Sequence, residues 1–316
     1  MDTKVKVLNI LNENEGSFVS GERMANEIGV SRMAISKAVA TLTEQGHTIE
    51  AVKHKGYKLD GKNDIFSDES LSAALKDSGI QGYYLPETVS TNIDAKRLSS
   101  EGVKPPFLVC TAKQTGGKGR MGRRFESPKG GVYFSLVLSG DKIASPSLVT
   151  ISAAWAISDV MERLTGIETS IKWVNDVYIK DKKAVGILTE GIVNMEEGGL
   201  SQVVIGCGIN LKTKSGDFSP SIRDIVTSFY PDGESSVKRV DVVAECAKAI
   251  IKAQEIDFLE EYRKKCFVLG KDIYVLRMNE KKPAKALRID KDGHLVVRYN
   301  DGSVESLSSG EVSIRF

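Results

Sequence analysis

A basic, glycine-rich segment stands between two strand-like stretches near the middle of the chain. Residues 113–129 contain six basic side chains and one acidic side chain, and glycine occupies positions 116, 117, 119 and 122. Glycine lets the backbone come close to a ligand, while arginine and lysine bind phosphate and carboxylate groups. The segment therefore predicts a flexible loop that closes over an anion. On these residues alone, a mobile basic loop without a ligand stays open as an alternative.

Two familiar phosphate-binding motifs do not fit this loop. Residues 117–122 match G-x-G-x-x-G, but a dinucleotide-binding fold needs a helix directly after that motif. Here Pro128 and two glycines lead into the strand-like run 132–138 instead. A Walker A loop needs Lys and then Ser or Thr after its last glycine, whereas Gly122 is followed by Arg123 and Arg124. The segment is thus an anion-binding loop of another kind.

Two charged side chains further along the chain lie where a sheet can present them to a ligand. Asp176 interrupts the strand-like run 171–179, and Lys183 ends a charged turn that begins at Asp181. Side chains at strand ends and turns often converge on ligands. Taken singly, each charge is also compatible with a solvated turn. Cys207 lies between two glycines without a base near it in sequence, which favours a structural role.

Composition excludes several other classes of protein. The four cysteines and three histidines share no ligand spacing, which disfavours a structural zinc site and a Ser-His-Asp or Cys-His mechanism. Unpaired cysteines of this kind are typical of a cytoplasmic protein. The longest stretch without Lys, Arg, Asp or Glu spans residues 143–158 and contains proline and several serines, so no membrane span is expected. The first residues do not resemble a signal peptide.

The N-terminal elements predict a DNA-binding domain. Residues 31–62 hold six basic and three acidic side chains, whereas residues 1–30 hold three basic and five acidic ones. A short helix over 21–28, a turn at Gly29 and a second helix capped by Ser31 have helix-turn-helix spacing. Two short strands follow within residues 48–59, around a basic turn at 53–56. This is a winged arrangement, with a helix for the major groove and a wing for phosphates.

The predicted DNA contacts come from the second helix and the wing. The alternative is an amphipathic helical hairpin that serves only for packing. The excess of basic over acidic side chains in residues 31–62, together with the wing, argues against it. The predicted contact residues are Ser31, Arg32, Met33, Ser36, Lys37, Lys53, His54 and Lys55.

Elements in the rest of the chain predict a larger mixed domain and a small β domain. A buried helix is expected from Ser145-Pro146 to Leu164, followed by strands over 171–179, 184–192 and 202–205. Over residues 272–316, apolar and polar residues alternate as they do in strands, and Asp-Gly turns interrupt the pattern. A polar stretch over 62–70 marks the first domain boundary. With 316 residues, we expect domains at 1–64, 65–268 and 269–316.

Five motifs in fixed order resemble the bifunctional biotin protein ligases that also act as biotin operon repressors. They are Ser90-Thr91-Asn92, Gln114 with the G-x-G-R-x-G-R loop, Lys172-Trp173-x-Asn175-Asp176, Lys183-x-x-Gly186-Ile187-Leu188, and Gly206-x-Gly208-Ile209-Asn210. The match extends over nearly the whole chain. Three positions depart from the family pattern: Val174 stands where proline is common, Lys118 where arginine is frequent, and Phe125 where tryptophan is common.

The resemblance implies a fold and an activity. The fold class is α+β, with an N-terminal winged helix-turn-helix, a central mixed α/β catalytic domain of the biotin/lipoate ligase type and a small C-terminal SH3-like β-barrel. The implied enzyme uses ATP, with Mg²⁺, to convert biotin to biotinoyl-5′-adenylate. It then transfers biotin to a lysine of the biotin carboxyl carrier protein of acetyl-CoA carboxylase or a related carboxylase. The adenylate is the corepressor that favours a homodimer on operator DNA, and the implied location is the cytoplasm.

The resemblance also implies roles for individual residues. Lys183, Arg120 and Asp176 are the implied catalytic residues, and Asp176 is the implied Mg²⁺ ligand. The implied biotin site consists of Ser90, Thr91, Asn92, Gln114, Gly117, Lys118, Gly119, Arg120, Lys183 and Gly186. The implied adenylate site consists of Arg120, Arg123, Phe125, Asn175, Asp176 and Asn210.

Two other functions stay open. A lipoate or octanoate ligase shares the catalytic fold, but the Ser-Thr-Asn motif and Gln114 favour a polar ring over a long acyl chain. A DNA-binding regulator that senses biotin without catalysis is the second alternative. The presence of Lys183, Asp176 and the loop arginines argues against it.

Overall fold

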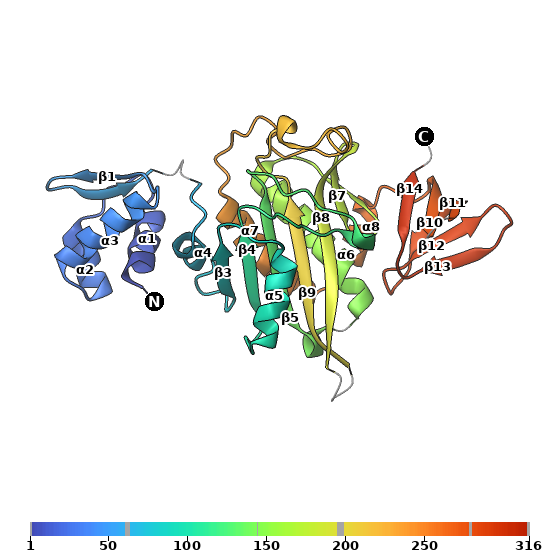
Figure 1. The fold of residues 1–316 in the computed structure, drawn as a ribbon, viewed down its shortest axis with the longest axis horizontal. Helices are drawn as coiled ribbons and strands as arrows, with labels where there is room; N and C mark the ends of the chain where they lie inside the picture. Colours follow the sequence, from blue (N-terminus) through green and yellow to red (C-terminus); the bar gives the residue numbers. More distant parts are fainter. Residues whose placement is uncertain (1, 61–63, 144, 195–198, 278–279, 315–316) are drawn as a thin grey trace.

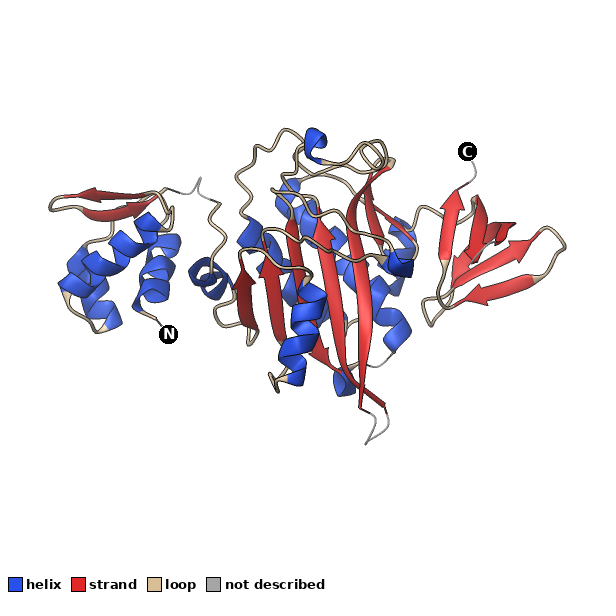
Figure 2. Cartoon of the chain, in the orientation of Figure 1, coloured by secondary structure: helices blue, strands red, loops and turns tan. Residues whose placement is uncertain are grey.

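The computed structural model describes residues 2–60, 64–143, 145–194, 199–277 and 280–314. The chain forms a small N-terminal unit, a large central unit and a small C-terminal unit, arranged in a row (Figure 1). The central unit combines a large sheet with helices, whereas the C-terminal unit is built of strands (Figure 2). This is the predicted α+β architecture.

The N-terminal unit is a winged helix-turn-helix, as the sequence predicts. Ser20 and Ser31 cap their helices by accepting hydrogen bonds from Arg23 and Ala34, and Gly29 takes the left-handed conformation that ends the first of these helices. A further helix precedes them. The elements are α1 (Thr3–Glu13), α2 (Gly21–Ile28), α3 (Arg32–Glu44), β1 (Ile49–Val52) and β2 (Gly56–Leu59).

The central unit is built on a seven-stranded sheet. Its first two strands are parallel and all other neighbours are antiparallel. In spatial order the strands are β3 (Gln81–Leu85), β4 (Phe107–Thr111), β5 (Val132–Ser139), β9 (Gly199–Ile209), β8 (Lys182–Asn194), β7 (Asp176–Ile179) and β6 (Ser170–Lys172). The strands β8 and β9 are long and form the middle of the site described below.

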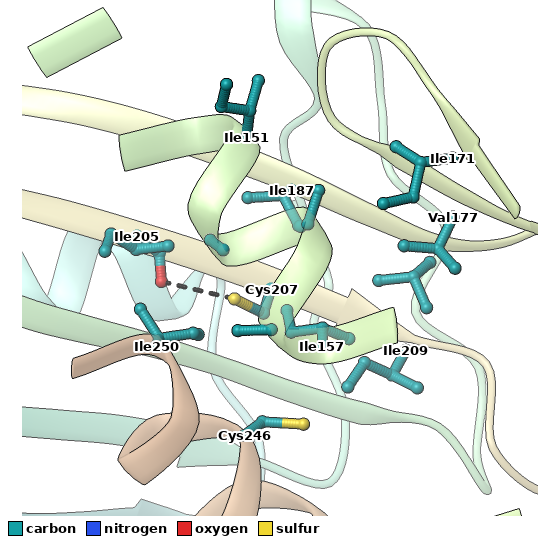
Figure 3. Packing of buried hydrophobic residues seen from close by; sticks show 14 of the residues in the cluster. Ile151, Ile157, Ile171, Val177, Ile187, Ile205, Cys207, Ile209, Cys246 and Ile250 are labelled. Carbon is teal, nitrogen blue, oxygen red and sulfur yellow. Dashed lines mark hydrogen bonds between the residues drawn. The ribbon is translucent and has the colours of Figure 1, made fainter. Parts of the chain in front are cut away.

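Helices cover both faces of this sheet. On one face, α6 (Pro146–Thr165) and α7 (Arg239–Ala253) pack side chains such as Ile157 and Ile250 against the strands (Figure 3). On the other face, α5 (Thr91–Ser100) packs Ala95 against Phe107 and Val109. The predicted helix from Pro146 is confirmed, and Gly166 ends it in the left-handed region. Two short helices, α4 (Asp68–Ala74) and α8 (Leu259–Lys265), complete the unit.

The C-terminal unit is a five-stranded antiparallel sheet. Its turns at Gly293 and Gly302 have positive φ, as the Asp-Gly patterns predict. Several of its buried side chains belong to the same apolar core as the central sheet, so the unit is fastened to the central one. In spatial order the strands are β13 (Val304–Leu307), β12 (Leu295–Tyr299), β11 (Glu280–Ile289), β10 (Asp272–Arg277) and β14 (Glu311–Ile314).

Ion pairs join the N-terminal and central units. Glu69 of α4 accepts a hydrogen bond of 2.5 Å from Lys4 of α1, and Asp64 pairs with Arg239 at 2.9 Å. Residues 62 and 63, part of the polar stretch in which we predict the boundary, lie outside the described residues. No helix in the described part of the chain combines the length and the hydropathy needed to cross a bilayer.

Candidate functional site

A cavity opens where the start of α5, the 113–129 loop and the strands β7 to β9 meet. All the residues predicted for biotin and adenylate line it except Gly117 and Asn210. The predicted residues that line it are Ser90, Thr91, Asn92, Gln114, Lys118, Gly119, Arg120, Arg123, Phe125, Asn175, Asp176, Lys183 and Gly186. The fold thus brings together segments that lie almost 100 positions apart in the sequence.

The cavity is strongly electropositive. Six basic side chains line it, namely Lys118, Arg120, Arg123, Arg124, Lys172 and Lys183, against a single acidic one, Asp176. Asp176 begins β7 and Lys183 is the second residue of β8, and their side chains form an ion pair of 2.7 Å. Such a lining favours a ligand with several negative charges.

The basic loop has an ordered turn at its tip. The N–H of Gly119 donates to the carbonyl of Arg123 at 2.7 Å, and the N–H of Phe125 donates to the carbonyl of Gly117 at 2.8 Å. Arg120 reaches from this turn to donate to Asn175 Oδ1 at 3.1 Å, while Asn175 Nδ2 donates to the carbonyl of Ile187 at 2.7 Å. The loop therefore lies over the cavity and contacts its opposite wall.

One end of the cavity is polar but uncharged. The side chains of Ser90, Thr91 and Asn92 are buried at the start of α5. The N–H of Thr91 donates to Gln114 Oε1 at 3.0 Å, and Gln114 Nε2 donates to Ser127 Oγ at 2.9 Å. Hydroxyl and amide groups held in this way provide fixed donors and acceptors for a neutral polar ring.

Phe125 packs directly on two glycines of the sheet. A Cβ atom at Gly186 would lie 2.8 Å from the Phe125 ring, and one at Gly208 would lie 2.3 Å from it. The Nζ atom of Lys183 lies 6.0 Å from the centroid of the same ring. Any larger residue at either glycine would displace the aromatic ring from the cavity.

Two predicted site residues have other surroundings. Gly117 packs against another part of its own loop, since a Cβ atom there would lie 2.5 Å from the carbonyl oxygen of Phe125. The amide Nδ2 of Asn210 donates to the carbonyl of Thr227 at 3.0 Å, and its backbone N–H donates to Ala184. Both residues therefore support neighbouring segments and do not line the cavity.

Several lining residues are not among the predicted site residues. Six of them belong to named positions of the motifs quoted above, so their places in the sequence carried a signal: Lys172, Trp173, Ile187, Leu188, Gly206 and Gly208. Met121, Arg124 and Cys207 also line the cavity. The Cys207 side chain packs among Ile157, Ile209 and Ile250 on the face that α6 and α7 cover (Figure 3), and burial raises the pKa of its thiol well above the usual value. This agrees with the structural role expected for it.

The C-terminal unit also reaches the cavity. Val312 of β14 contributes to its lining, and Trp173 Nε1 donates to the carbonyl of Gly293 at 3.1 Å. No motif in residues 269–316 signals this contact, because it depends on how two distant segments pack.

The predicted DNA contacts lie together on the N-terminal unit. Arg32, Met33 and Ser36 of α3 and Lys53 and His54 of the wing line one groove. Lys37 and Lys55 are exposed but do not line the groove, and the hydroxyl of Ser31 caps α3. Met33 is 81% exposed. The helix and the wing thus share one largely polar groove, in which Met33 is an exposed apolar residue.

Known proteins resemble this chain along its whole length. Residues 4–58 match an HTH domain, residues 82–210 match the Biotin/lipoate A/B protein ligase family, and residues 268–315 match the Biotin protein ligase C terminal domain. The bifunctional ligase/repressor BirA of Bacillus subtilis is 30% identical over an alignment of 320 positions, which covers 98% of this chain and 97% of the relative. The protein of the same name from Escherichia coli is 26% identical over 95% of this chain and 94% of its own length.

Solved structures show the same central fold. Biotin protein ligase from Aquifex aeolicus in complex with biotin and ATP matches with a TM-score of 0.64 and 26% identity, covering 74% of this chain and 98% of that one. The Bacillus subtilis relative is thus 30% identical over almost the full length of both chains, and this chain has an HTH domain followed by both ligase domains. The chain belongs to the family of bifunctional ligase/repressors of the biotin protein ligase type.

Proposed function

We propose that this chain is an ATP-dependent ligase that makes biotinoyl-5′-adenylate and transfers biotin to a lysine of a biotin carboxyl carrier protein. The observation that carries the proposal is the cavity itself, in which six basic side chains and one acidic one adjoin a buried, neutral polar end. A cationic end suits the phosphates of ATP, and a neutral polar end suits a ureido ring. Relatives named as ligases, and a neighbouring structure with biotin and ATP, support the assignment.

The first half-reaction brings two anions together. A carboxylate oxygen of biotin attacks the α-phosphorus of ATP, a new P–O bond forms, and the bond to pyrophosphate breaks. The two groups repel until cations neutralise them. In our proposal Lys183 contacts the biotin carboxylate and the reacting phosphate, while Arg120 and Arg123 hold the adenylate phosphate under the loop. The pair with Asp176 keeps the Lys183 ammonium in place before substrates arrive.

The remaining residues position the two substrates. Ser90, Thr91, Asn92 and Gln114 offer the ureido ring its donors and acceptors, and Gly186 leaves space beside them. Phe125 and Asn175, which also line the cavity, contact the adenylate in our proposal. In the second half-reaction the amine of the carrier lysine attacks the acyl carbon and AMP leaves. No covalent bond to the protein is needed, which is consistent with the buried, unreactive position of Cys207.

Asp176 fits a shared role in binding Mg²⁺. Within the described residues, no three His, Cys, Asp or Glu side chains gather to form a metal site. Magnesium is commonly held by one or two carboxylates together with substrate phosphates, so a single carboxylate fits an ion that arrives with ATP. When bound, such an ion would neutralise phosphate charge.

We further propose that the N-terminal unit binds operator DNA with the adenylate as corepressor. Arg32 of α3 and Lys53 of the wing line one groove, and Lys37 and Lys55 of the same two elements are exposed. Winged and helix-turn-helix proteins often bind paired half-sites as dimers, so adenylate binding should favour a homodimer. Sedimentation with and without the adenylate tests this, and a monomer under both conditions would contradict it.

Transfer of biotin to an isolated carrier domain tests the enzyme directly. The purified chain, ATP, Mg²⁺ and biotin should increase the mass of the carrier domain by one biotinyl group. A carrier domain whose acceptor lysine is replaced by arginine is the matched control and should stay unmodified. No modification of the unaltered carrier domain, under conditions in which adenylate forms, would contradict the transfer step.

A further inference from the structure

The outward face of α3 has a definite composition. The side chains on its inner face belong to the apolar core of the N-terminal unit, namely Ile35, Ala38, Val39 and Leu42. Between positions 33 and 40, the exposed residues are spaced at i, i+3, i+4 and i+7, so they form one stripe along the opposite side of the helix. The residues of this stripe are Met33, Ser36, Lys37 and Ala40. The stripe is the part of α3 that can meet a ligand.

The N-terminal half of the stripe lines the groove that α3 shares with the wing. Met33 and Ser36 line this groove from the helix, while Lys53 and His54 line it from the wing. In helix-turn-helix proteins, the N-terminal residues of the second helix contact base edges in the major groove. Met33 is the second residue of α3 and is 81% exposed. It therefore belongs to the part of the helix that comes nearest to the bases.

The helix lacks the side chains that read adenine through paired hydrogen bonds. Asparagine and glutamine donate and accept at adenine N6 and N7, but Arg32–Glu44 contains neither residue. The hydroxyls of Thr41 and Thr43 donate to backbone carbonyls of the same helix, at 3.1 and 2.9 Å. An A·T pair also presents the C5-methyl group of thymine in the major groove, where apolar side chains contact it. Two of the four stripe residues, Met33 and Ala40, are apolar.

Side-chain length favours Met33 over Ala40 for this contact. Methionine is unbranched and has three rotatable bonds, so its terminal methyl group can adjust to an irregular surface. The Ala40 side chain ends at Cβ, and the helix backbone itself would have to approach the base. Ala40 also lies seven residues after Met33, which is about 10 Å farther along the helix from its N-terminus. Met33 is therefore the better placed of the two apolar residues.

We propose that Met33 reads A·T pairs of the operator by contacting the C5-methyl group of thymine in the major groove. This rests on the DNA binding proposed above and adds the chemical feature by which one base is recognised. The cations of α3 and the wing contact phosphates, which carry no direct sequence information. A contact between two apolar groups removes both from water. It is lost when thymine is replaced by uracil, which forms the same base pair without the methyl group.

The test uses a DNA sequence that the protein itself selects. With biotin, ATP and Mg²⁺ present, the full-length protein selects a binding sequence from a library of random duplexes. Each thymine of that sequence is then replaced by uracil, one position at a time, and the dissociation constant of each duplex is measured. For the parent protein, at least one replacement should weaken binding about 3- to 5-fold, the effect expected for losing one buried methyl group.

Three variants separate base reading from a structural effect. Met33→Ala should bind the thymine and uracil duplexes equally at the sensitive position, and should keep the parent's affinity for a duplex of unrelated sequence, where phosphate contacts dominate. Met33→Leu keeps a large apolar side chain and should keep a preference for thymine. Val304→Ala is the control, because Val304 is an apolar residue of the C-terminal unit with 57% exposure. It should leave every ratio as in the parent.

The outcomes distinguish this inference from the proposed function. If the parent selects a sequence in which no uracil replacement weakens binding, no thymine methyl group is read and the inference is wrong. If Met33→Ala keeps all the parent's ratios, another residue reads the methyl group. If Met33→Ala weakens binding to selected and unrelated duplexes alike, Met33 supports the fold of the N-terminal unit and does not read bases. Failure of the parent to select any sequence would instead overturn the proposed operator binding.

Discussion

At the scale of single residues, Lys183 stands out for its surroundings. Its ammonium pairs with the Asp176 carboxylate at 2.7 Å and lies 6.0 Å from the centroid of the Phe125 ring, in a cavity that five other cations line. A lysine at the second position of a strand, with its side chain 28% exposed, contributes little to the apolar core. Replacing Lys183 should therefore slow the reaction and leave the stability of the fold nearly unchanged.

Lys183→Ala should slow adenylate formation by on the order of 10²- to 10³-fold, because a cation aimed at the developing charge is lost. Single-turnover formation of labelled adenylate measures this rate. Lys182→Ala, at the preceding position outside the cavity lining, is the control and should behave like the parent. Near-normal adenylation by Lys183→Ala would remove the residue from its proposed role.

Arg120→Ala should shorten the retention of the adenylate. Loss of one charge-assisted contact costs about 1.5–3 kcal/mol, which corresponds to roughly 10- to 150-fold faster release. Dissociation of preformed labelled adenylate in the presence of excess unlabelled ligand gives the rate. Lys129→Ala, which changes a cation outside the cavity lining, should release the adenylate at the parent rate. Equal retention by Arg120→Ala and the parent would contradict the assignment.

At the scale of elements, the wing and α3 predict an electrostatic DNA-binding surface. Lys53→Ala/Lys55→Ala removes two exposed cations from the wing. The slope of log affinity against log salt concentration for duplex DNA should become shallower by about 2. The matched control is Lys104→Ala/Lys285→Ala, which removes two exposed cations from the other units. An unchanged slope for the wing variant would show that these lysines do not contact phosphates.

Local patterns predicted those elements that have local causes. The caps at Ser20 and Ser31, the left-handed glycines and the Asp-Gly turns determine helix and strand ends within a few residues, so the winged unit and the β domain were predictable. Contacts between distant segments had no such signal. The bond from Trp173 to Gly293 spans 120 positions and that from Asn92 to Glu190 spans 98. Both depend on the packing of the whole sheet and could not be derived from motif spacing.

At the scale of the whole molecule, Glu69 connects the DNA-binding unit to the catalytic one. It accepts hydrogen bonds from Lys4 and Gln45, both of the N-terminal unit. Burial opposes the ionisation of Glu69, but hydrogen bonds from Lys4, the backbone and Gln45 outweigh it and lower its pKa from 4.5 to about 2. Because this pKa is lower in the folded state, the stabilisation is present above pH 4.5 and is lost as the pH falls toward 2.

Glu69→Gln should lower the free energy of unfolding by about 1–2 kcal/mol at pH 6, and the difference from the parent should shrink as the pH falls from 4.5 toward 2. Urea unfolding across this range measures it. Glu13→Gln is the control, since Glu13 also pairs across the two units, with Lys76 at 3.2 Å, but is 59% exposed. Its effect should stay below about 0.5 kcal/mol. A difference for Glu69→Gln that does not change with pH would exclude the ionised carboxylate as its cause.

Exchange of labelled pyrophosphate into ATP by the purified protein tests the central claim most directly. It requires formation of the acyl adenylate and its reversal, and it needs no carrier protein or DNA. We predict exchange that depends on biotin and is absent with lipoate. Exchange with lipoate alone would identify a lipoate ligase. Binding of biotin without any exchange would contradict the ligase and leave a DNA-binding sensor of biotin.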